Sequence, residues 1–283
     1  MGAIKNAIKN LRVGAAAAGA NLVVGFGPGL LPELTTEVPA DFNSYPGYEA
    51  PDGAVAKATQ EEMLVWINHS DKGTVWKLQY DMRNELEGHM MLKRETPTFI
   101  YDDSLDMTGF QDGAGNPDAG RDTEVACVPE GQPGAGGSHI IAQRWIHDLK
   151  GFHAQSIPEQ EGVFGRTKGV APEGAIKLEV QPDHSHIAHV DLRVGKTGDS
   201  AAPKRNEITR RSTPYAFPAP PTGGDGVVGL YFIGFCAEQA PLDERMRAMY
   251  GMDGQVRDKL TEFSTPASGA FYFAPSVEVL DAL

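Results

Sequence analysis

The chain has 283 residues, of which 41% are hydrophobic and 22% are charged, and this ordinary globular composition argues against disorder. Its 38 acidic residues outnumber the 25 basic ones, and the net charge of -13 argues against nucleic acid or an anionic membrane surface as the main partner. It has only two cysteines, Cys127 and Cys236, so a disulfide framework is excluded and a reducing compartment fits.

The first half of the chain predicts helices and strands in mixed order. Ile4, Ile8 and Leu11 fall at helical spacing, which favours a short amphipathic helix over a signal or transit segment, and a strand is predicted at residues 21–26. An apolar run within residues 61–68 predicts a buried strand, and apolar spacing at residues 74–87 predicts a helix. Residues 98–101 are strand-like. This order indicates an α+β protein.

A glycine-rich loop at residues 105–117 surrounds one acid, Asp112. Gly109, Gly113 and Gly115 allow sharp turns and a close approach of the backbone to another group, and Asn116-Pro117 is a turn signal. Three interpretations stay open from the loop alone. It could be a surface turn, a calcium loop that lacks the usual acidic spacing, or the site of a catalytic carboxylate.

The second half follows a segment at residues 116–137 that is rich in glycine, proline and acidic residues and predicts a junction. Residues 138–147 predict a strand and the start of a helix, and residues 149–163 predict a helix. His184 and His186 lie in a segment at residues 184–192 and would share one face if it is a strand. After a polar insert at residues 193–206, the sequence predicts a buried strand at residues 229–236 and helices at residues 242–250 and 256–263.

Several motifs in a fixed order resemble those of the dye-decolourising peroxidases, which are haem enzymes. Gly109-Phe110-Gln111-Asp112-Gly113, followed by Asn116-Pro117, resembles their Gly-x-x-Asp-Gly signature. The downstream segments resemble the compact, intracellular branch that is often called class B. They are residues 143–149, 160–168, 185–187, 208–215 and 272–276. The resemblance covers roughly residues 21–283, and the ordered set is more specific than any one motif.

This resemblance implies an α+β fold with two ferredoxin-like halves, in which antiparallel sheets carry helices on the outside. Residues 1–130 would form the N-terminal half with the Asp112 loop, and residues 131–283 would form the C-terminal half that binds haem. Family members usually begin with an extra strand before the first helix, whereas this sequence starts almost at that helix. The difference indicates either a truncated chain or a lost first strand.

The resemblance also implies roles for individual residues. His186 is expected to be the axial ligand of the haem iron, and Asp258 its hydrogen-bond partner. Asp112 is expected to act as the distal acid–base group, and Arg210 as the distal cation that stays charged at any working pH. One departure is near the ligand, because His189 stands where the family commonly has arginine.

Three more residues are expected at the cofactor from the same resemblance. Arg166 would pair with a haem propionate, since arginine matches carboxylates well, and Ser212 and Phe232 would contact the haem. On chemistry alone, other histidines compete with His186 for the iron. These competitors are His147, His153, His184 and His189.

The expected function is that of a peroxidase containing haem b, which reduces hydrogen peroxide and takes electrons from small reducing substrates such as dyes or phenolics. One alternative is a haem-handling protein without significant turnover, and another is an interaction domain without haem. The resemblance further implies a cytoplasmic homo-oligomer with no nucleic-acid or membrane partner.

Overall fold

An antiparallel sheet organises the molecule. The computed structural model describes residues 1–118, 120–170, 175–192, 207–221, 224 and 226–283, so the insert expected at residues 193–206 lies outside the described residues. The described strands of the main sheet are β1 (Asn21–Phe26), β4 (Met63–Asn68), β5 (Ser138–His147), β6 (Thr209–Arg210), β7 (Thr213–Phe217), β8 (Val227–Cys236), β9 (Ser264–Pro266) and β10 (Ala270–Ala274). They follow the order β4-β1-β10-β5-β8-β6, with β7 also on β8 and β9 on β5. A separate pair joins β2 (Tyr48–Glu49) to β3 (Val55–Ala56).

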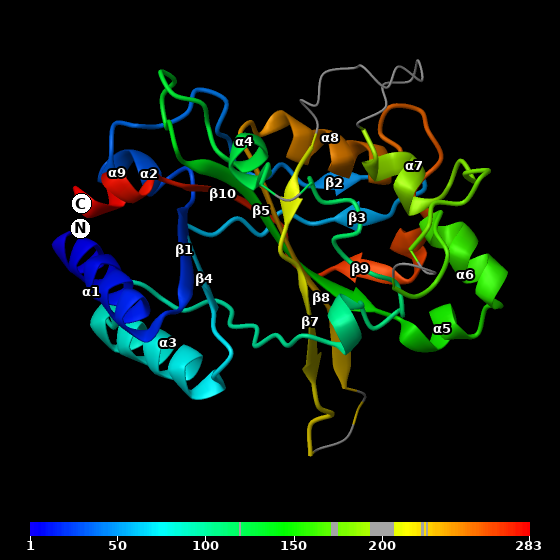
Figure 1. Ribbon diagram of the computed structural model, residues 1–283, viewed down its shortest axis with the longest axis horizontal. Coiled ribbons are helices and arrows are strands. Elements are labelled where there is room, and N and C mark those ends of the chain that lie inside the picture. The colour runs from blue at the N-terminus through cyan, green and yellow to red at the C-terminus, as the bar shows by residue number, and fades with distance from the viewer. Residues whose placement is uncertain (119, 171–174, 193–206, 222–223, 225) are drawn as a thin grey trace.

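Helices lie at both ends of this sheet (Figure 1). The described α-helices are α1 (Gly2–Ala18), α2 (Leu31–Leu34), α3 (Lys72–Leu86), α4 (Asp122–Ala126), α5 (Leu149–His153), α6 (Ile157–Phe164), α7 (His186–Val190), α8 (Ala240–Met249) and α9 (Val277–Asp281). Two 3-10 turns, η1 (Asp102–Ser104) and η2 (Lys259–Glu262), complete the description. Helices α1 and α3 pack together beside β1 and β4, whereas α5, α6 and α7 lie at the far end. None of the described helices has the length and apolar character needed to cross a membrane.

The expected α+β class is confirmed, and so are the strand at residues 21–26 and the N-terminal helix. Three local predictions are wrong. The helix expected at residues 149–163 is two helices, because Ser156 forms a capping box with Glu159 and starts α6 anew. At residues 256–263 only η2 forms, with the Asp258 carboxylate as its cap. Residues 98–101 form no strand, although the Phe99 N–H donates to the Pro214 carbonyl at 3.0 Å.

Two segments near the candidate ligand also differ from expectation. Residues 138–147 are strand throughout, and a helix begins only after Asp148, whose carboxylate accepts from the Gly151 N–H at 2.9 Å. The segment that carries His186 is the helix α7 instead of a strand. Ser185 caps this helix, since its hydroxyl accepts from the Ala188 N–H, and an N-cap outweighs the weak apolar alternation of the sequence.

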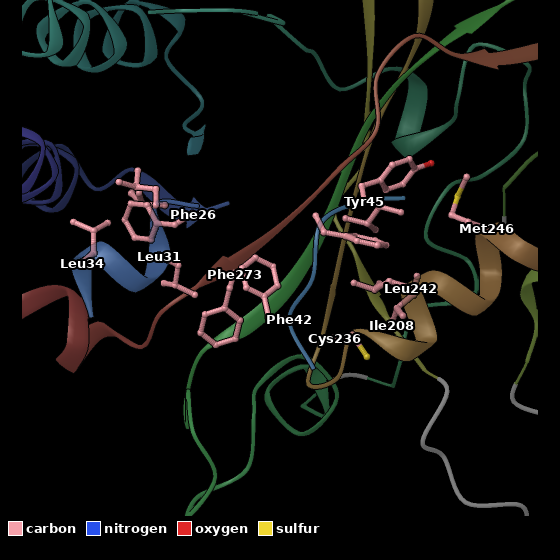
Figure 2. Packing of buried hydrophobic residues seen from close by; sticks show 14 of the residues in the cluster. Phe26, Leu31, Leu34, Phe42, Tyr45, Ile208, Cys236, Leu242, Met246 and Phe273 are labelled. Carbon is pink, nitrogen blue, oxygen red and sulfur yellow. The ribbon is translucent and has the colours of Figure 1, made fainter. Parts of the chain in front are cut away.

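The strand β5 separates part of the core from a cavity, because successive side chains of a strand point to opposite faces. Ile140 and Ala142 pack on one face with Ile233 of β8. The cavity on the other face is lined by Ile141, Gln143, Trp145 and His147. The larger core lies further along the sheet, where the ring of Phe273 packs 6.0 Å from that of Phe42 (Figure 2).

A buried pair attaches the Asp112 loop to β5. His147 Nε2 lies 3.1 Å from Asp106 Oδ1, while Asp106 Oδ2 accepts from the Thr108 hydroxyl at 2.7 Å. The other ring nitrogen of His147 lies 2.9 Å from Ser264 Oγ on β9. Burial by itself would raise the pKa of Asp106, but the hydrogen bond and charge of His147 and the Thr108 hydroxyl hold that pKa below its usual value. The pairing with His147 therefore favours the ionised form of the Asp106 carboxylate.

Replacing Phe273 should test the packing of the larger core. The ring of Phe273 is fully buried, and a Cβ on Gly137 would lie only 2.5 Å from it, so the site is densely filled. Phe273→Ala is expected to lower the free energy of unfolding by about 3–5 kcal/mol, measured by urea denaturation. Val13→Ala on the exposed side of α1 is the control, with an expected change within about 0.5 kcal/mol. Equal losses in the two variants would contradict this assignment of the core.

Replacing Asp106 should give a pH-dependent loss of stability. Its folded-state pKa lies below the unfolded value of about 4, so the ionised carboxylate stabilises the fold above that pH and the contribution fades as the pH falls through the folded-state pKa. Asp106→Asn should cost about 1–3 kcal/mol at pH 6 and progressively less below pH 4, measured by urea unfolding. Asp52→Asn, on the exposed Arg257 pair, should have little effect. A loss of unfolding free energy in Asp106→Asn that is the same at pH 3 and pH 6 would contradict this prediction.

Candidate functional site

One cavity brings together five of the seven predicted site residues. It lies against β5 and β8, and side chains of α6, α7 and α8 also line it. The five residues are Arg166, Asp112, His186, Arg210 and Phe232. The remaining two, Asp258 and Ser212, are not on the cavity wall. Asp258 lies behind His186, which it contacts directly.

The orientation of His186 is fixed by Asp258. His186 Nδ1 lies 2.6 Å from Asp258 Oδ2, and the other carboxylate oxygen accepts from the Leu260 N–H at 2.9 Å. Asp258 is fully buried. A buried carboxylate needs such partners, and a carboxylate on one ring nitrogen fixes the tautomer and raises the basicity of the other. His186 therefore carries its proton on Nδ1 and leaves Nε2 as the basic nitrogen.

The competing histidines are less suited to bind a metal in this cavity. His147 is the other histidine of the lining, but both of its ring nitrogens have partners. His153 and His189 are not part of the lining; Nε2 of His153 and both ring nitrogens of His189 face backbone carbonyls. His184 is exposed in the turn before α7, so it shares no strand face with His186. All eight histidines lie in the described parts of the chain, and His186 is the one that lines the cavity with an unbonded ring nitrogen.

Asp112 and Arg210 reach the cavity from two distant parts of the sequence. The Asp112 backbone N–H donates to the Ser104 carbonyl at 3.3 Å, and no side chain in the described parts of the molecule hydrogen-bonds to its carboxylate. Arg210 belongs to β6, in register with Gly234 of β8. Its neighbour Arg211 points elsewhere and pairs with Asp122 at 3.3 Å, as expected for adjacent strand residues.

Asn116 joins the loop to Arg210, and sequence reasoning had treated it only as a turn residue. Its Oδ1 accepts from the Arg210 backbone N–H at 2.9 Å and also from Arg210 Nε at 3.4 Å. Its Nδ2 donates to the Arg210 carbonyl at 3.0 Å. A Cβ on Gly115 would lie 3.0 Å from Arg210 Nη2, so a glycine here lets the guanidinium sit against the loop. No local signal in the sequence connects these two segments.

Of the three residues expected to contact the haem, Arg166 and Phe232 line the cavity and Ser212 does not. Arg166 lines the cavity and donates from Nη1 to the Ala175 carbonyl at 2.5 Å, and Phe232 supplies an apolar part of the wall. The Ser212 hydroxyl is buried and has no hydrogen-bond partner among the described residues. Arg245 of α8 was not anticipated. It is a half-buried cation on the wall, and desolvation lowers its pKa to about 10, so it remains charged at neutral pH.

Comparison with curated proteins finds dye-decolorizing peroxidases. That of Mycolicibacterium paratuberculosis is 29% identical over 228 residues, which are 80% of this chain and 61% of the relative. That of Mycobacterium tuberculosis is 27% identical over 228 residues, with 80% and 64% covered. The matched stretch thus spans less than two thirds of the length of these relatives.

Solved structures of the same kind share the fold. The dye-decolorizing protein from V. cholerae has a TM-score of 0.85 and 28% identity, with 98% of this chain and 90% of that chain covered. DyPB from Rhodococcus jostii has a TM-score of 0.87 and 26% identity, with 99% and 89% covered. A variant of DypB from that organism, solved in complex with heme, has a TM-score of 0.86 and 26% identity, with 100% and 90% covered.

The family model described as Dyp-type peroxidase, C-terminal, matches residues 103–279, which is well over half of the chain. The matched range includes the Asp112 loop, α7 with His186, β6 with Arg210 and the Asp258 segment. The structural matches also agree with the expected α+β fold class. The chain therefore belongs to the Dyp-type peroxidase family.

Proposed function

We propose that this protein is a haem peroxidase that reduces hydrogen peroxide and oxidises small electron donors such as dyes or phenolics. The observation that carries the proposal is the cavity in which a carboxylate-bonded histidine occurs together with an arginine and with a carboxylate to which no described side chain hydrogen-bonds. Membership of the family and the heme-containing relative from Rhodococcus jostii support it.

The chemistry of the cavity fits a haem. His186 Nε2 is a neutral donor that would hold the haem iron, and its partner Asp258 would raise the basicity of that nitrogen. Apolar side chains such as Ile141, Phe232 and Met249 suit the porphyrin faces. Arg166 is a cation of the wall that suits a propionate carboxylate. Haem, when bound, would supply the iron at which peroxide is reduced and through which electrons are taken from the donor.

Asp112 is suited to move the proton that peroxide reduction requires. Its carboxylate can accept a proton from one oxygen of hydrogen peroxide and return it to the other oxygen, which leaves as water. The absence of a side-chain partner within the described residues leaves both carboxylate oxygens available for this transfer.

Arg210 is suited to stabilise charge. Arginine does not lose its proton, so it cannot be the base, but its guanidinium can stabilise the negative charge that develops as the O–O bond breaks. Asn116 would hold the guanidinium for this role through its bonds to the Arg210 backbone and Nε. Simple haem carriage needs neither Asp112 nor Arg210, and this favours a peroxidase over a haem-handling protein.

A spectrum and a turnover assay test the proposal together. Purified protein is expected to show a Soret band, or to gain one on addition of haem, and to decolourise an anthraquinone dye only when peroxide is present. A Soret band without peroxide-dependent turnover would favour the haem-handling alternative. No Soret band after reconstitution would leave only an interaction domain without haem.

Further parts of the hypothesis extend beyond the family assignment. We infer that the cofactor is haem b and that the protein is a cytoplasmic homo-oligomer without nucleic-acid or membrane partners. Both cysteines are free, which is compatible with a reducing compartment. The division into halves at residues 1–130 and 131–283 stays a prediction, and Arg166, Ser212 and Phe232 are proposed haem contacts.

Removing the proposed ligand should abolish haem retention. His186→Ala removes the histidine that lines the cavity with an unbonded ring nitrogen and leaves His147, whose two ring nitrogens already have partners, so the Soret absorbance per protein is expected to fall to near zero after gel filtration. His184→Ala changes an exposed turn residue two positions away and should keep the parent spectrum. If His184→Ala loses the haem and His186→Ala keeps it, the ligand has been misassigned.

The pH profile should separate the roles of Asp112 and Arg210. Removing an acid–base group costs about 10²–10⁴ in rate and removing an electrostatic donor about 10²–10³, so rates at one pH will not rank them. Parent activity is expected to favour mildly acidic pH. Asp112→Ala should lose the acidic limb of the profile, whereas Arg210→Ala should keep that limb at reduced height.

The measurement is the rate of the first absorbance change after stopped-flow mixing with peroxide, between pH 3 and pH 8. Asp118→Ala, at an exposed acid directly after the loop, and Arg211→Ala, at an arginine that pairs with Asp122, are the matched controls and should retain the parent profile. If Asp112→Ala reacts at the parent rate with the parent pH dependence, Asp112 is a structural turn residue.

A further inference from the structure

His189 has an unusual set of partners. It lies on α7, three residues after His186, and its side chain is buried with 1% of its surface exposed. His189 Nδ1 lies 2.8 Å from the carbonyl oxygen of Ser185, and His189 Nε2 lies 2.7 Å from the carbonyl oxygen of Val256. Both ring nitrogens therefore face hydrogen-bond acceptors.

This geometry has a consequence for the protonation of the ring. A backbone carbonyl can only accept, and a neutral imidazole has one N–H and one lone pair. Two carbonyl partners thus require an N–H on each nitrogen, which is the imidazolium form. In the neutral ring, one buried carbonyl oxygen would face a nitrogen lone pair and lose its hydrogen bond, which is costly because water cannot replace it.

The two carbonyls belong to the two segments that carry His186 and its carboxylate partner Asp258. Ser185 caps α7 and directly precedes His186. Val256 is two residues before Asp258, whose carboxylate holds His186. His189 therefore links the segment of the histidine to the segment of its carboxylate, and a backbone bond from the Lys259 N–H to the His184 carbonyl at 2.9 Å links the same two segments.

We propose that His189 is a positioning residue that acts as an imidazolium and keeps Asp258 against His186. As the pH rises and His189 loses its proton, the hold of Asp258 on His186, the proposed iron ligand, weakens. The part that concerns haem rests on the function proposed above. The protonation of the ring does not, because it follows from the two carbonyl contacts alone.

Charged groups on the neighbouring elements do not remove the need for this proton. The titratable and charged residues on α7 and on the elements packed against it are His186 of α7 and Asp191, which caps its C-terminus, Arg257, Asp258 and Lys259 of the Val256 segment, Asp243, Glu244, Arg245 and Arg247 of α8, and Glu159 and Glu161 of α6. Asp191 pairs with Lys177, and Arg257 pairs with Asp52 at 2.7 Å. Asp258, fully buried as well, is the anion of the Val256 segment and favours a cation nearby.

Two substitutions at His189 separate the effect of its positive charge from that of its polar side chain. The resemblance noted above gives arginine as the common residue at this position, and arginine keeps both its charge and several donors at any pH. His189→Arg should therefore preserve the link at every pH. His189→Gln keeps a polar side chain but has no charge. His139→Gln removes another buried histidine, far along β5 beside Phe42 and Phe273, and serves as the control.

The first measurement does not depend on haem. Ring ¹⁵N chemical shifts of histidine-labelled protein as purified, with the His189 signals assigned by their loss in His189→Gln, should show both ring nitrogens protonated at pH 6. One nitrogen should lose its proton as the pH is raised. A neutral ring at pH 6 would overturn the inference, whether or not the protein binds haem.

The second measurement is the rate of haem transfer from the holoprotein to apomyoglobin between pH 6 and pH 9. Parent protein should release haem roughly tenfold faster at the upper end, since loss of a group that supports a metal ligand typically costs about 10–100-fold in affinity. His189→Arg should be slow and flat, His189→Gln fast at every pH, and His139→Gln should follow the parent. Protonation of an axial histidine would give the opposite trend, with faster release at low pH.

The outcomes distinguish this inference from the function on which it rests. If parent and His189→Arg show the same pH dependence, His189 is a neutral packing residue and the inference is wrong. If none of the proteins holds haem, the proposed function fails, and the ring nitrogen shifts still decide the protonation of His189. If His189→Arg does not fold, the contrast between parent and His189→Gln across pH decides the outcome, because His189→Gln must then lack the parent's pH dependence.

Discussion

A fully buried carboxylate must be paired, and the way in which Asp258 meets this requirement organises the site. One oxygen bonds His186 Nδ1 at 2.6 Å, and the other accepts the Leu260 N–H that begins η2. The carboxylate therefore fixes the tautomer of the histidine and the start of a turn at once. The short helix α7 presents the basic nitrogen of His186 to the cavity because its other nitrogen is held in this way.

The sheet determines where the rest of the site can be. β5 pairs with β10, β8 and β9, and its alternating side chains place apolar residues in the core on one face and the cavity wall on the other. At its end, His147 holds Asp106 and with it the start of the glycine-rich loop. A single strand thus connects the packing of the core to the position of the loop that carries Asp112.

The distal residues depend on an amide rather than on an ion pair. Asn116 and Arg210 are 94 residues apart, yet the Asn116 side chain satisfies both backbone groups of Arg210. Such a contact fixes the position of a charged side chain without neutralising it. Arg210 and Asp112 consequently reach one cavity while no described side chain bonds to the Asp112 carboxylate, and this combination suits a group that must exchange a proton.

The sequence by itself determined the α+β class, the strand of residues 21–26, the glycine-rich loop and the family resemblance, because periodicity and turn chemistry are local. It failed at α7, where the cap of Ser185 prevailed over a weak strand pattern, and at α5 and α6, which Ser156 separates. Only the tertiary structure decided which histidine has an unbonded nitrogen in the cavity, that Arg245 lies on its wall, and what Asn116 and His189 contact. The contact of Asn116 with Arg210 and that of His189 with Val256 join residues 94 and 67 positions apart, which no local sequence pattern can relate.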